Sequence, residues 1–160
     1  MALGQGSEIF VLAAITVLAK KISRKTFLAI GLVAYGLRML VFANVEAIPA
    51  AVQVPTLLLG ILMHGLCFGC FIFVSFMIVD EEAPNDVRAS AQSLYNLVIV
   101  GIGIIVGSLI AGRVDAWAKT KAEEDYFHNL FTVPMWASLA CLVVLFFLYP
   151  RGKRTAEVTA

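Results

Sequence analysis

Polar and ionisable side chains interrupt otherwise apolar stretches of this sequence at a few positions. Gln5 and Glu8 lie in the first stretch, Arg38 in the second, and His64 in the third, with Phe68 one helical turn further on. An ionisable side chain inside a membrane costs several kcal/mol even by low estimates, so such residues are rare and usually functional. Together these groups can accept hydrogen bonds, form ion pairs, take up a proton and stack on a flat solute.

The spacing of these residues predicts that they share one depth. A helix rises about 1.5 Å per residue and the hydrocarbon core is about 30 Å thick, so its midplane lies about 15 Å from either edge. Glu8 and Phe68 lie ~18 Å from the nearest charged connector, and Arg38 lies ~20 Å from it. His64 lies ~24 Å and Asn96 ~12 Å from theirs. A polar layer supplied by four helices is typical of a solvated cavity, and transporters hold substrates at this depth.

Each of these side chains also has a structural interpretation. Glu8 and Arg38 can form an ion pair that satisfies two charges in lipid. His64 and Asn96 can each form a hydrogen bond between helices, and Phe68 can be ordinary core. The residue types alone leave both interpretations open.

Five apolar segments must position this layer. The chain has 160 residues and is 61% hydrophobic with a mean hydropathy of +0.91, far more apolar than a soluble domain. A membrane-spanning helix needs about 20 residues. We therefore predict an all-α integral membrane protein, a truncated helix bundle with a transmembrane domain over residues 1–150 and a tail over 151–160. The predicted spans are residues 2–19, 26–43, 54–79, 89–112 and 131–149, with a polar connector over 113–130.

The connectors predict the orientation. KKISRK, DEEAPNDVR and the tail share one side of the membrane and carry eight lysines and arginines, against three on the other side. Lys and Arg in short loops collect on the cytoplasmic side. The C-terminus is therefore expected in the cytoplasm and the N-terminus outside. No basic region precedes the first apolar run, so no signal peptide is predicted. Because an external N-terminus without a signal is unusual, we expect this chain to be either part of a longer protein or a degenerate or internally initiated piece.

Two further features bear on packing and motion. Gly103 and Gly107 begin a face of small residues, which permits close approach of another helix. In the loop DEEAPNDVR, Arg88 is placed to pair with Asp80, Glu81 or Glu82. This loop is either a solvated turn or a cytoplasmic latch that breaks and reforms during a rocking motion.

Other chemistries are not indicated. Cys67 and Cys70 have the spacing of a redox or metal pair, but no second such pair and no charged partner accompanies them, so we interpret them as small buried residues. Ser7, His64 and the cysteines form no nucleophile–base pattern or metal triad. We predict a protein that is not an enzyme and has no metal, cofactor or nucleic-acid partner.

Four stretches of the chain resemble the nucleoside:proton symporter family of the major facilitator superfamily. They are similar to the Q-x-S-E opening of the family's eighth helix, its W-x-L-R-x-x-x-F-A ninth helix, its tenth-to-eleventh loop and its glycine-rich eleventh helix. In this chain they read GQGSEIFVL, AYGLRMLVFA, VDEEAPNDVRASAQSLYNLV and GIGIIVGSLIAGRVDAW. Because order and spacing agree over nearly the whole chain, the resemblance implies helices eight to twelve of a bacterial inner-membrane transporter.

The resemblance also implies roles for individual residues. Gln5 and Glu8 match the glutamine and glutamate that line the nucleoside cavity. Phe68 matches one of two substrate-facing aromatic residues, whereas His64 stands where tyrosine is usual, and Gly69 stands where aspartate is frequent. A carboxylate can accept both hydroxyls of a ribose and a ring can stack on the base. Because burial disfavours a charged carboxylate, Glu8 is also the candidate carrier of the co-transported proton.

The expected function is therefore nucleoside/proton symport by alternating access, with partners that include the substrate, the proton and the lipid bilayer. Alternating access moves one half of a transporter against the other, so we expect this chain to be inactive without its N-terminal helices, on the same or another chain. The alternatives are a facilitator for sugars or other hydroxylated solutes, and a half-protein that acts in assembly or regulation without transport.

Overall fold

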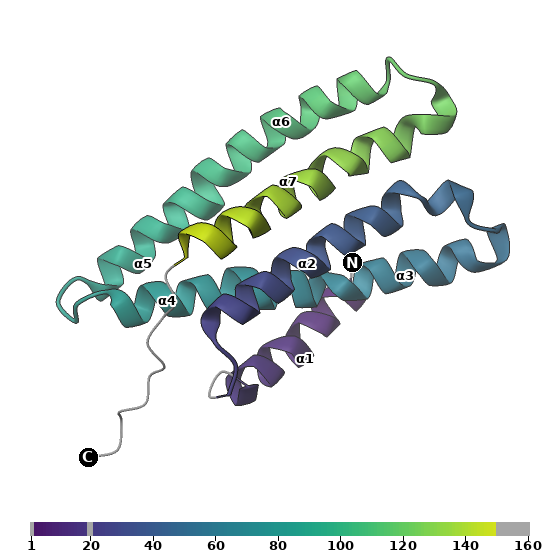
Figure 1. Ribbon diagram of the computed structural model, residues 1–160. Coiled ribbons are helices and arrows are strands. Elements are labelled where there is room, and N and C mark those ends of the chain that lie inside the picture. Colours follow the sequence, from purple (N-terminus) through teal and green to yellow (C-terminus); the bar gives the residue numbers. More distant parts are fainter. Residues whose placement is uncertain (1, 19–20, 150–160) are drawn as a thin grey trace.

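Helices form every regular element in the described part of the chain, which confirms the predicted all-α class (Figure 1). The computed structural model describes residues 2–18 and 21–149, and the side chains of residues 6–18, 21–123 and 125–149. In chain order the elements are α1 (Ala2–Leu18), α2 (Arg24–Ala43), η1 (Val45–Ala47), α3 (Ala50–Cys67), η2 (Phe68–Phe73), α4 (Val74–Glu82), α5 (Arg88–Asn96), η3 (Leu97–Ile102), α6 (Gly103–Ala118), η4 (Glu123–Asp125) and α7 (Tyr126–Leu148).

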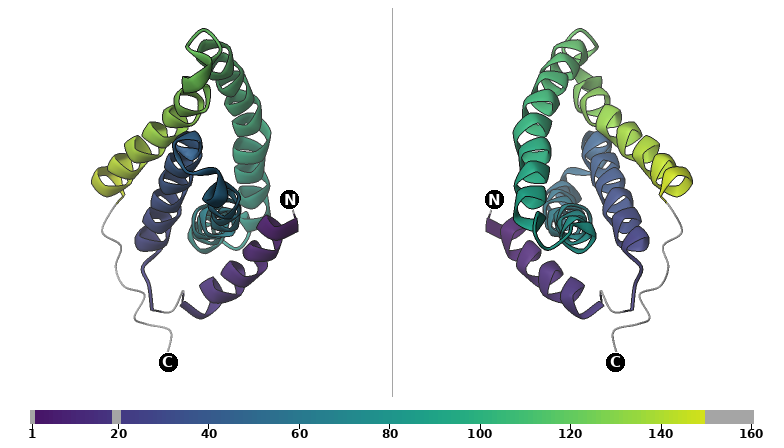
Figure 2. Two further views of the ribbon diagram at one scale, coloured as in Figure 1. Left: turned by 90° about the vertical axis from the view of Figure 1, so that its right-hand side faces the viewer. Right: turned by 90° about the vertical axis from the view of Figure 1, so that its left-hand side faces the viewer.

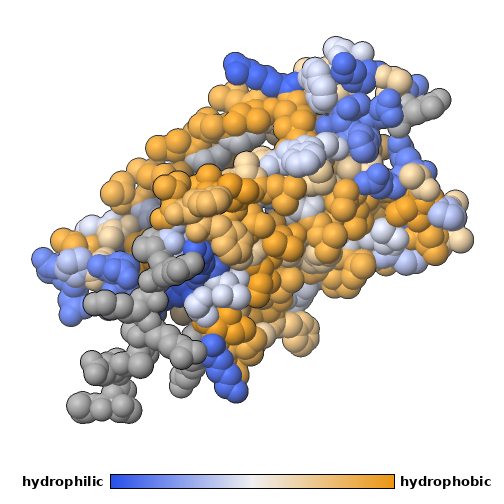
Figure 3. All heavy atoms as spheres, viewed as in Figure 1, coloured by the Kyte–Doolittle hydropathy of each residue, from blue (hydrophilic) through white to orange (hydrophobic). Residues whose placement is uncertain are grey.

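Four of these helical stretches are long and apolar enough to cross a membrane. They cover Arg24–Ala43, Ala50–Glu82, Arg88–Ala118 and Tyr126–Leu148, and α1 contributes a shorter apolar helix over Gly6–Leu18. The two longest contain π-helical turns, because η2 joins α3 to α4 and η3 joins α5 to α6. The surface in Figure 3 shows the matching pattern, with an apolar belt along the middle of the helices and polar residues gathered at both ends.

The helices extend beyond several predicted spans. The helix expected over 54–79 covers Ala50–Glu82, and the helix expected to end at residue 112 continues to Ala118. Asp115 explains this second difference. Its carboxylate accepts hydrogen bonds from Lys119 Nζ at 2.7 Å and from the Tyr126 hydroxyl at 2.6 Å. Polar residues here extend the helix and tie it to α7, so the connector expected over 113–130 is confined to residues 119–125.

The best-packed region is formed by α1, α2 and the long helix that runs from α3 to α4. Its core contains Ile15 from α1, Phe27 and Leu28 from α2, Cys70 from η2 and Val74 from α4, all at most 6% exposed. Cys67 is also buried, at 7% exposed, which confirms that both cysteines are buried small residues. The remaining helices pack differently: α7 lies along α2, whereas α6 and α7 meet at one end and diverge toward the other (Figure 2).

Glycines allow the closest helix contacts in this region. A Cβ atom on Gly65 of α3 would lie 2.5 Å from the Ser7 backbone carbon and 2.6 Å from Glu8 N, both on α1. A Cβ atom on Gly31 of α2 would lie 2.9 Å from Phe71 N on η2. Real Cβ atoms essentially never come this close to other atoms. Gly65 and Gly31 therefore allow α1 and α2 to approach the long helix at these two points.

Candidate functional site

Three polar side chains from three helices form one chain of contacts. Glu8 of α1 lies with its Oε1 atom 3.1 Å from His64 Nε2 on α3. The other ring nitrogen, His64 Nδ1, lies 3.0 Å from Arg38 Nη1 on α2. No ion pair in the described part of the chain joins Glu8 directly to Arg38, because the imidazole lies between them.

The local sequence explains why this contact forms. Gly65 follows His64 and admits the backbone of Ser7 and Glu8, so α1 crosses α3 at the level of the imidazole. Arg38 and Phe42 lie one turn apart on α2, and the guanidinium carbon lies 5.2 Å from the Phe42 ring centre. This ring holds the guanidinium by a cation–π contact while its Nη1 reaches the imidazole.

Phe68 adds an aromatic face beside the polar chain. Its ring centre lies 6.3 Å from that of His64, with the two rings tilted by 42°. Phe68 is also the first residue of the π-helical segment η2. Such segments interrupt the regular helix and frequently occur at functional sites. The spacing of residues in the sequence gave no indication of this π-helical segment.

The cluster is partly open rather than sealed. The side chain of Glu8 is 23% exposed, that of His64 42%, and Phe68 is 40% exposed. Within the guanidinium of Arg38, by contrast, the Nε atom is buried and has no hydrogen-bond partner. An accessible acid, imidazole and ring next to a well-held guanidinium form a surface that can bind a polar, partly aromatic solute.

The structure separates the other predicted residues from this cluster. Asn96 is exposed at the end of α5, a helix that packs against α4. The predicted polar layer is therefore not continuous: Glu8, Arg38, His64 and Phe68 come together, and Asn96 does not. Gln5 belongs to α1, but its side chain lies outside the described part of the chain.

The small-residue face has no close neighbour in the described chain. A Cβ atom on Gly107 would meet nothing within 4 Å, and one on Gly103 would touch only the Val98 carbonyl of its own helix, at 3.4 Å. This face is therefore open to lipid or to helices outside the described residues.

The predicted latch residues lie at the other end of the long helix. Arg88 Nε lies 4.0 Å from Asp80 Oδ1, so these two residues face each other across the loop. The neighbouring Glu81 and Glu82 have a different partner, because both pair with Arg24 at the start of α2. Sequence reasoning used the charge of Arg24 only for orientation and missed this link between α2 and α4.

Lys25 makes a second link that sequence reasoning missed. Its ammonium donates hydrogen bonds to the Phe146 and Tyr149 carbonyls at 3.0 and 3.2 Å, at the C-terminal end of α7. A cation is stabilised there by the carbonyls that the helix leaves unpaired. The start of α2 and the ends of α4 and α7 therefore lie at one end of the molecule.

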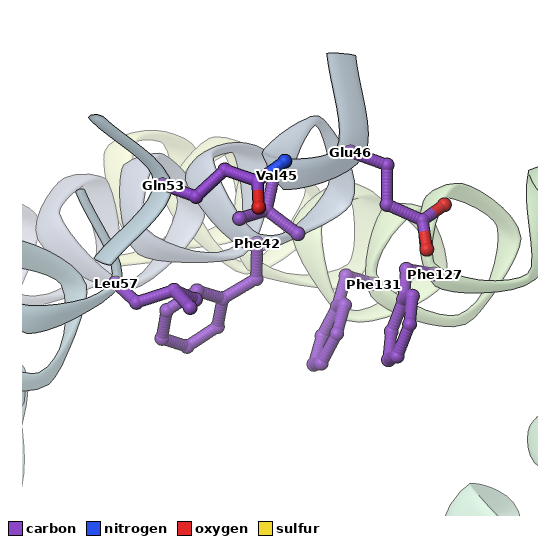
Figure 4. A pocket seen from close by; sticks show the side chains of 7 residues that line it. All are labelled: Phe42, Val45, Glu46, Gln53, Leu57, Phe127 and Phe131. Atoms are coloured by element: carbon purple, nitrogen blue, oxygen red, sulfur yellow. The ribbon is translucent and has the colours of Figure 1, made fainter. Parts of the chain in front are cut away.

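An open cavity of about 430 Å³ lies at the opposite end, where α2 turns into α3 (Figure 4). Phe127 and Phe131 of α7 stack in its wall with rings 7° from parallel, and Phe42 forms another side. Glu46 and Gln53 supply its polar groups. Phe42 connects this cavity to the polar cluster, since the Arg38 guanidinium lies over the same ring.

Comparison with known proteins shows the family of this chain. Residues 1–154 match the family described as "Nucleoside H+ symporter". The chain belongs to this family. The family resemblance predicted from the sequence is thereby confirmed, and the expectation that the protein is not an enzyme agrees with relatives that are permeases and transporters.

Three relatives of the family illustrate the match, all from Escherichia coli K12. The "Putative nucleoside transporter YegT" is 34% identical over 98% of this chain and 38% of its own length. The xanthosine permease is 26% identical over 92% of this chain and 34% of its own length. The nucleoside permease NupG is 28% identical over 71% of this chain and 27% of its own length. The chain thus spans little more than a third of these relatives at most, and no solved structure matches it.

Proposed function

We propose that this chain is the C-terminal part, helices eight to twelve, of a nucleoside/proton symporter in a bacterial inner membrane. The observation that supports the proposal best is the contact chain of Glu8, His64 and Arg38 with Phe68 beside it. Three helices bring an acid, an imidazole and a guanidinium together. We place this cluster at mid-membrane depth, where an ionisable group is costly unless function requires it.

The cluster offers the groups that a nucleoside needs. The partly exposed Glu8 carboxylate accepts hydrogen bonds from vicinal ribose hydroxyls, and the exposed face of Phe68 stacks on a base. Gln5, one turn before Glu8 on α1, is proposed to line the same cavity. Glu8 is also the proposed proton carrier, since it is the acid of the cluster and is accessible.

The proposed protein needs more than this chain. Alternating access requires a second bundle against which the first can rock, and the chain spans 38% of the length of the putative nucleoside transporter YegT. We therefore propose that the N-terminal helices, on the same or another polypeptide, complete the cavity. The four long helical stretches span the membrane and the shorter α1 lies within it. The end with Arg24, Lys25 and Arg88 faces the cytoplasm, following the excess of positive charge there.

The test is the substitution Glu8→Gln in the full-length protein, reconstituted in proteoliposomes. Without a titrating carboxyl, uridine accumulation driven by a proton gradient should fall about tenfold or more, since a hydrogen bond to a charged group is lost as well. Exchange of internal for external uridine, which needs no net proton movement, should persist. Glu46→Gln is the matched control, because Glu46 is an exposed acid outside the cluster.

Three results would count against the proposal. Unchanged concentrative uptake by the Glu8→Gln protein would remove Glu8 from proton coupling. Transport of sugars, with no competition by uridine or adenosine, would favour the facilitator of other hydroxylated solutes. Uptake by the isolated 160 residues as a demonstrated monomer would contradict the need for further helices.

A further inference from the structure

The hydrogen-bond chemistry of Arg38 determines where the proton of His64 lies. A guanidinium has five N–H donors and no acceptor, and it does not lose its proton in proteins. At 3.0 Å from Arg38 Nη1, the Nδ1 atom of His64 must therefore be the acceptor and carry no hydrogen. A neutral imidazole has one N–H group, so its hydrogen is on Nε2. That atom faces Glu8 Oε1 at 3.1 Å and donates to it.

A second proton on His64 would disrupt this arrangement. It would place an N–H group on Nδ1 opposite a group that can only donate, and a positive charge against the guanidinium. A proton on Glu8 costs no such contact, because the second carboxyl oxygen can carry it while Oε1 still accepts from Nε2. The geometry therefore directs an incoming proton to the acid and away from the imidazole.

Other titratable groups around the imidazole do not alter this balance. Tyr35 of α2 and Cys67 of α3 lie within electrostatic reach of Arg38, and both are neutral near pH 7. Cys70 of η2 is buried in the core. Among residues 6–18 of α1, Glu8 is the titratable side chain. Arg38 is thus the cation that faces Nδ1.

We infer that Arg38 is a positioning residue that holds His64 in the neutral form with its proton on Nε2, so that Glu8 alone of the three takes up the transported proton. The transport part of this inference rests on the proposed function, whereas the position of the imidazole proton does not. The role differs from that of a structural ion pair, since Arg38 acts on Glu8 through the orientation of the ring between them.

Nitrogen NMR of the full-length protein with ¹⁵N-labelled histidine tests the proton position directly. The His64 signals are those that disappear in the His64→Gln protein. At neutral pH we expect one protonated and one unprotonated ring nitrogen, with the proton on Nε2. A proton on Nδ1, or a proton on both nitrogens, would overturn the inference.

Two Arg38 variants distinguish the hydrogen-bond donor of Arg38, which positions the His64 ring, from the volume of the Arg38 side chain. Arg38→Met removes the donor, so the ring proton should no longer be confined to Nε2 and a signal of protonated Nδ1 should appear. Arg38→Lys restores a donor-only cation and should restore the wild-type signals. If the Met variant does not fold, the wild-type tautomer and the Lys variant still decide the matter. Identical ring-nitrogen signals in all three proteins would overturn the positioning role.

The pH profile of uptake tests the consequence for transport. His64→Gln keeps an amide that can donate to Glu8 but cannot titrate. Uptake is measured against external pH in the same proteoliposomes. We expect a lower rate with the shape of the wild-type pH dependence preserved. A flattened profile would show that His64 carries the proton and would overturn the inference, whereas absence of nucleoside uptake by the wild type would contradict only the proposed function.

Discussion

The two longest helices of this protein are similar in length and hydropathy but differ completely in packing. In the helix over Ala50–Glu82, a third of the most apolar window is buried, 33%, whereas in the helix over Arg88–Ala118 none of it is, 0%. The glycines of the two helices differ in the same way. Those of the first helix admit atoms of α1 and α2, while Gly107 of the second meets nothing within 4 Å.

This difference shows which long helix buries apolar surface against other helices of the described chain and which leaves that surface exposed. Apolar side chains along α6 are strongly exposed, for example Ile105 at 63% and Leu109 at 65%. Lipid can cover such a surface, but a face of small residues is typical of a helix–helix contact. The region of α1 to α4 holds the polar cluster with helices of its own, whereas the helix over Arg88–Ala118 presents a surface suited to helices that the proposal places on the missing part of the protein.

The largest effect should come from adding one methyl group at Gly65, in the packed region. Gly65→Ala places a carbon against the backbone of α1, so the helices must separate and Glu8 must move from His64. Overpacking of this kind costs about 1–3 kcal/mol. We expect lower thermal stability of the purified full-length protein in detergent and loss of uptake.

Gly107→Ala is the matched substitution on the open helix. If that face meets only lipid, stability should change by no more than about 1 kcal/mol, the difference in helix propensity between the two residues. Destabilisation as large as that of Gly65→Ala would show instead that a helix outside the described residues packs on Gly107. Equal tolerance of both alanines would contradict the close contact between α1 and α3.

Ion pairs at the end bearing Arg24 provide a smaller contrast. Arg24 joins α2 to α4 within the packed region through Glu81 and Glu82, whereas Arg88 and Asp80, 4.0 Å apart, join α4 to α5. Partly exposed pairs contribute about 0–1 kcal/mol. In double-mutant cycles with alanine, the coupling of Arg24 to Glu81 should exceed that of Arg88 to Asp80, measured as thermal unfolding at low salt. The reverse order would mean that the ion pair across the loop, and not the one in the packed region, has the larger coupling energy.

The smallest effect concerns the turn between α6 and α7. The hydrogen bond from Lys119 to Asp115 raises the pKa of the Lys119 ammonium above its usual value. Because the pKa is raised, the contact contributes fully to folding stability when the pH is below the ordinary lysine pKa. This contribution is lost as the pH rises through the raised pKa of Lys119. Asp115→Asn should return the Lys119 pKa toward its usual value with little change in stability, since the site is exposed. NMR titration of methylated lysines would detect this, and an unchanged Lys119 signal would contradict the contact.

Much of the fold followed from the sequence. Apolar stretches of the length of a bilayer, separated by charged connectors, predicted helices whose positions along the chain agree with the structure apart from their ends. The nearly constant rise of a helix per residue predicted one common depth for Glu8, Arg38, His64 and Phe68, and in the structure these side chains lie together. The helix ends were harder to place, since the polar pair Asp115 and Lys119 extends a helix that hydropathy alone would end earlier.

Which residues touch was decided only by the tertiary structure. Depth does not fix the rotation of a helix about its axis or the choice of its neighbour, and so the sequence could not place the imidazole between Glu8 and Arg38 or leave Asn96 apart. For the same reason it could not assign Glu81 and Glu82 to Arg24. The sequence by itself determined an all-α membrane chain with ionisable groups inside its apolar helices, because hydropathy and helical rise act along one helix at a time. Packing between helices, governed here by Gly65 and Gly31, decided which of those groups meet.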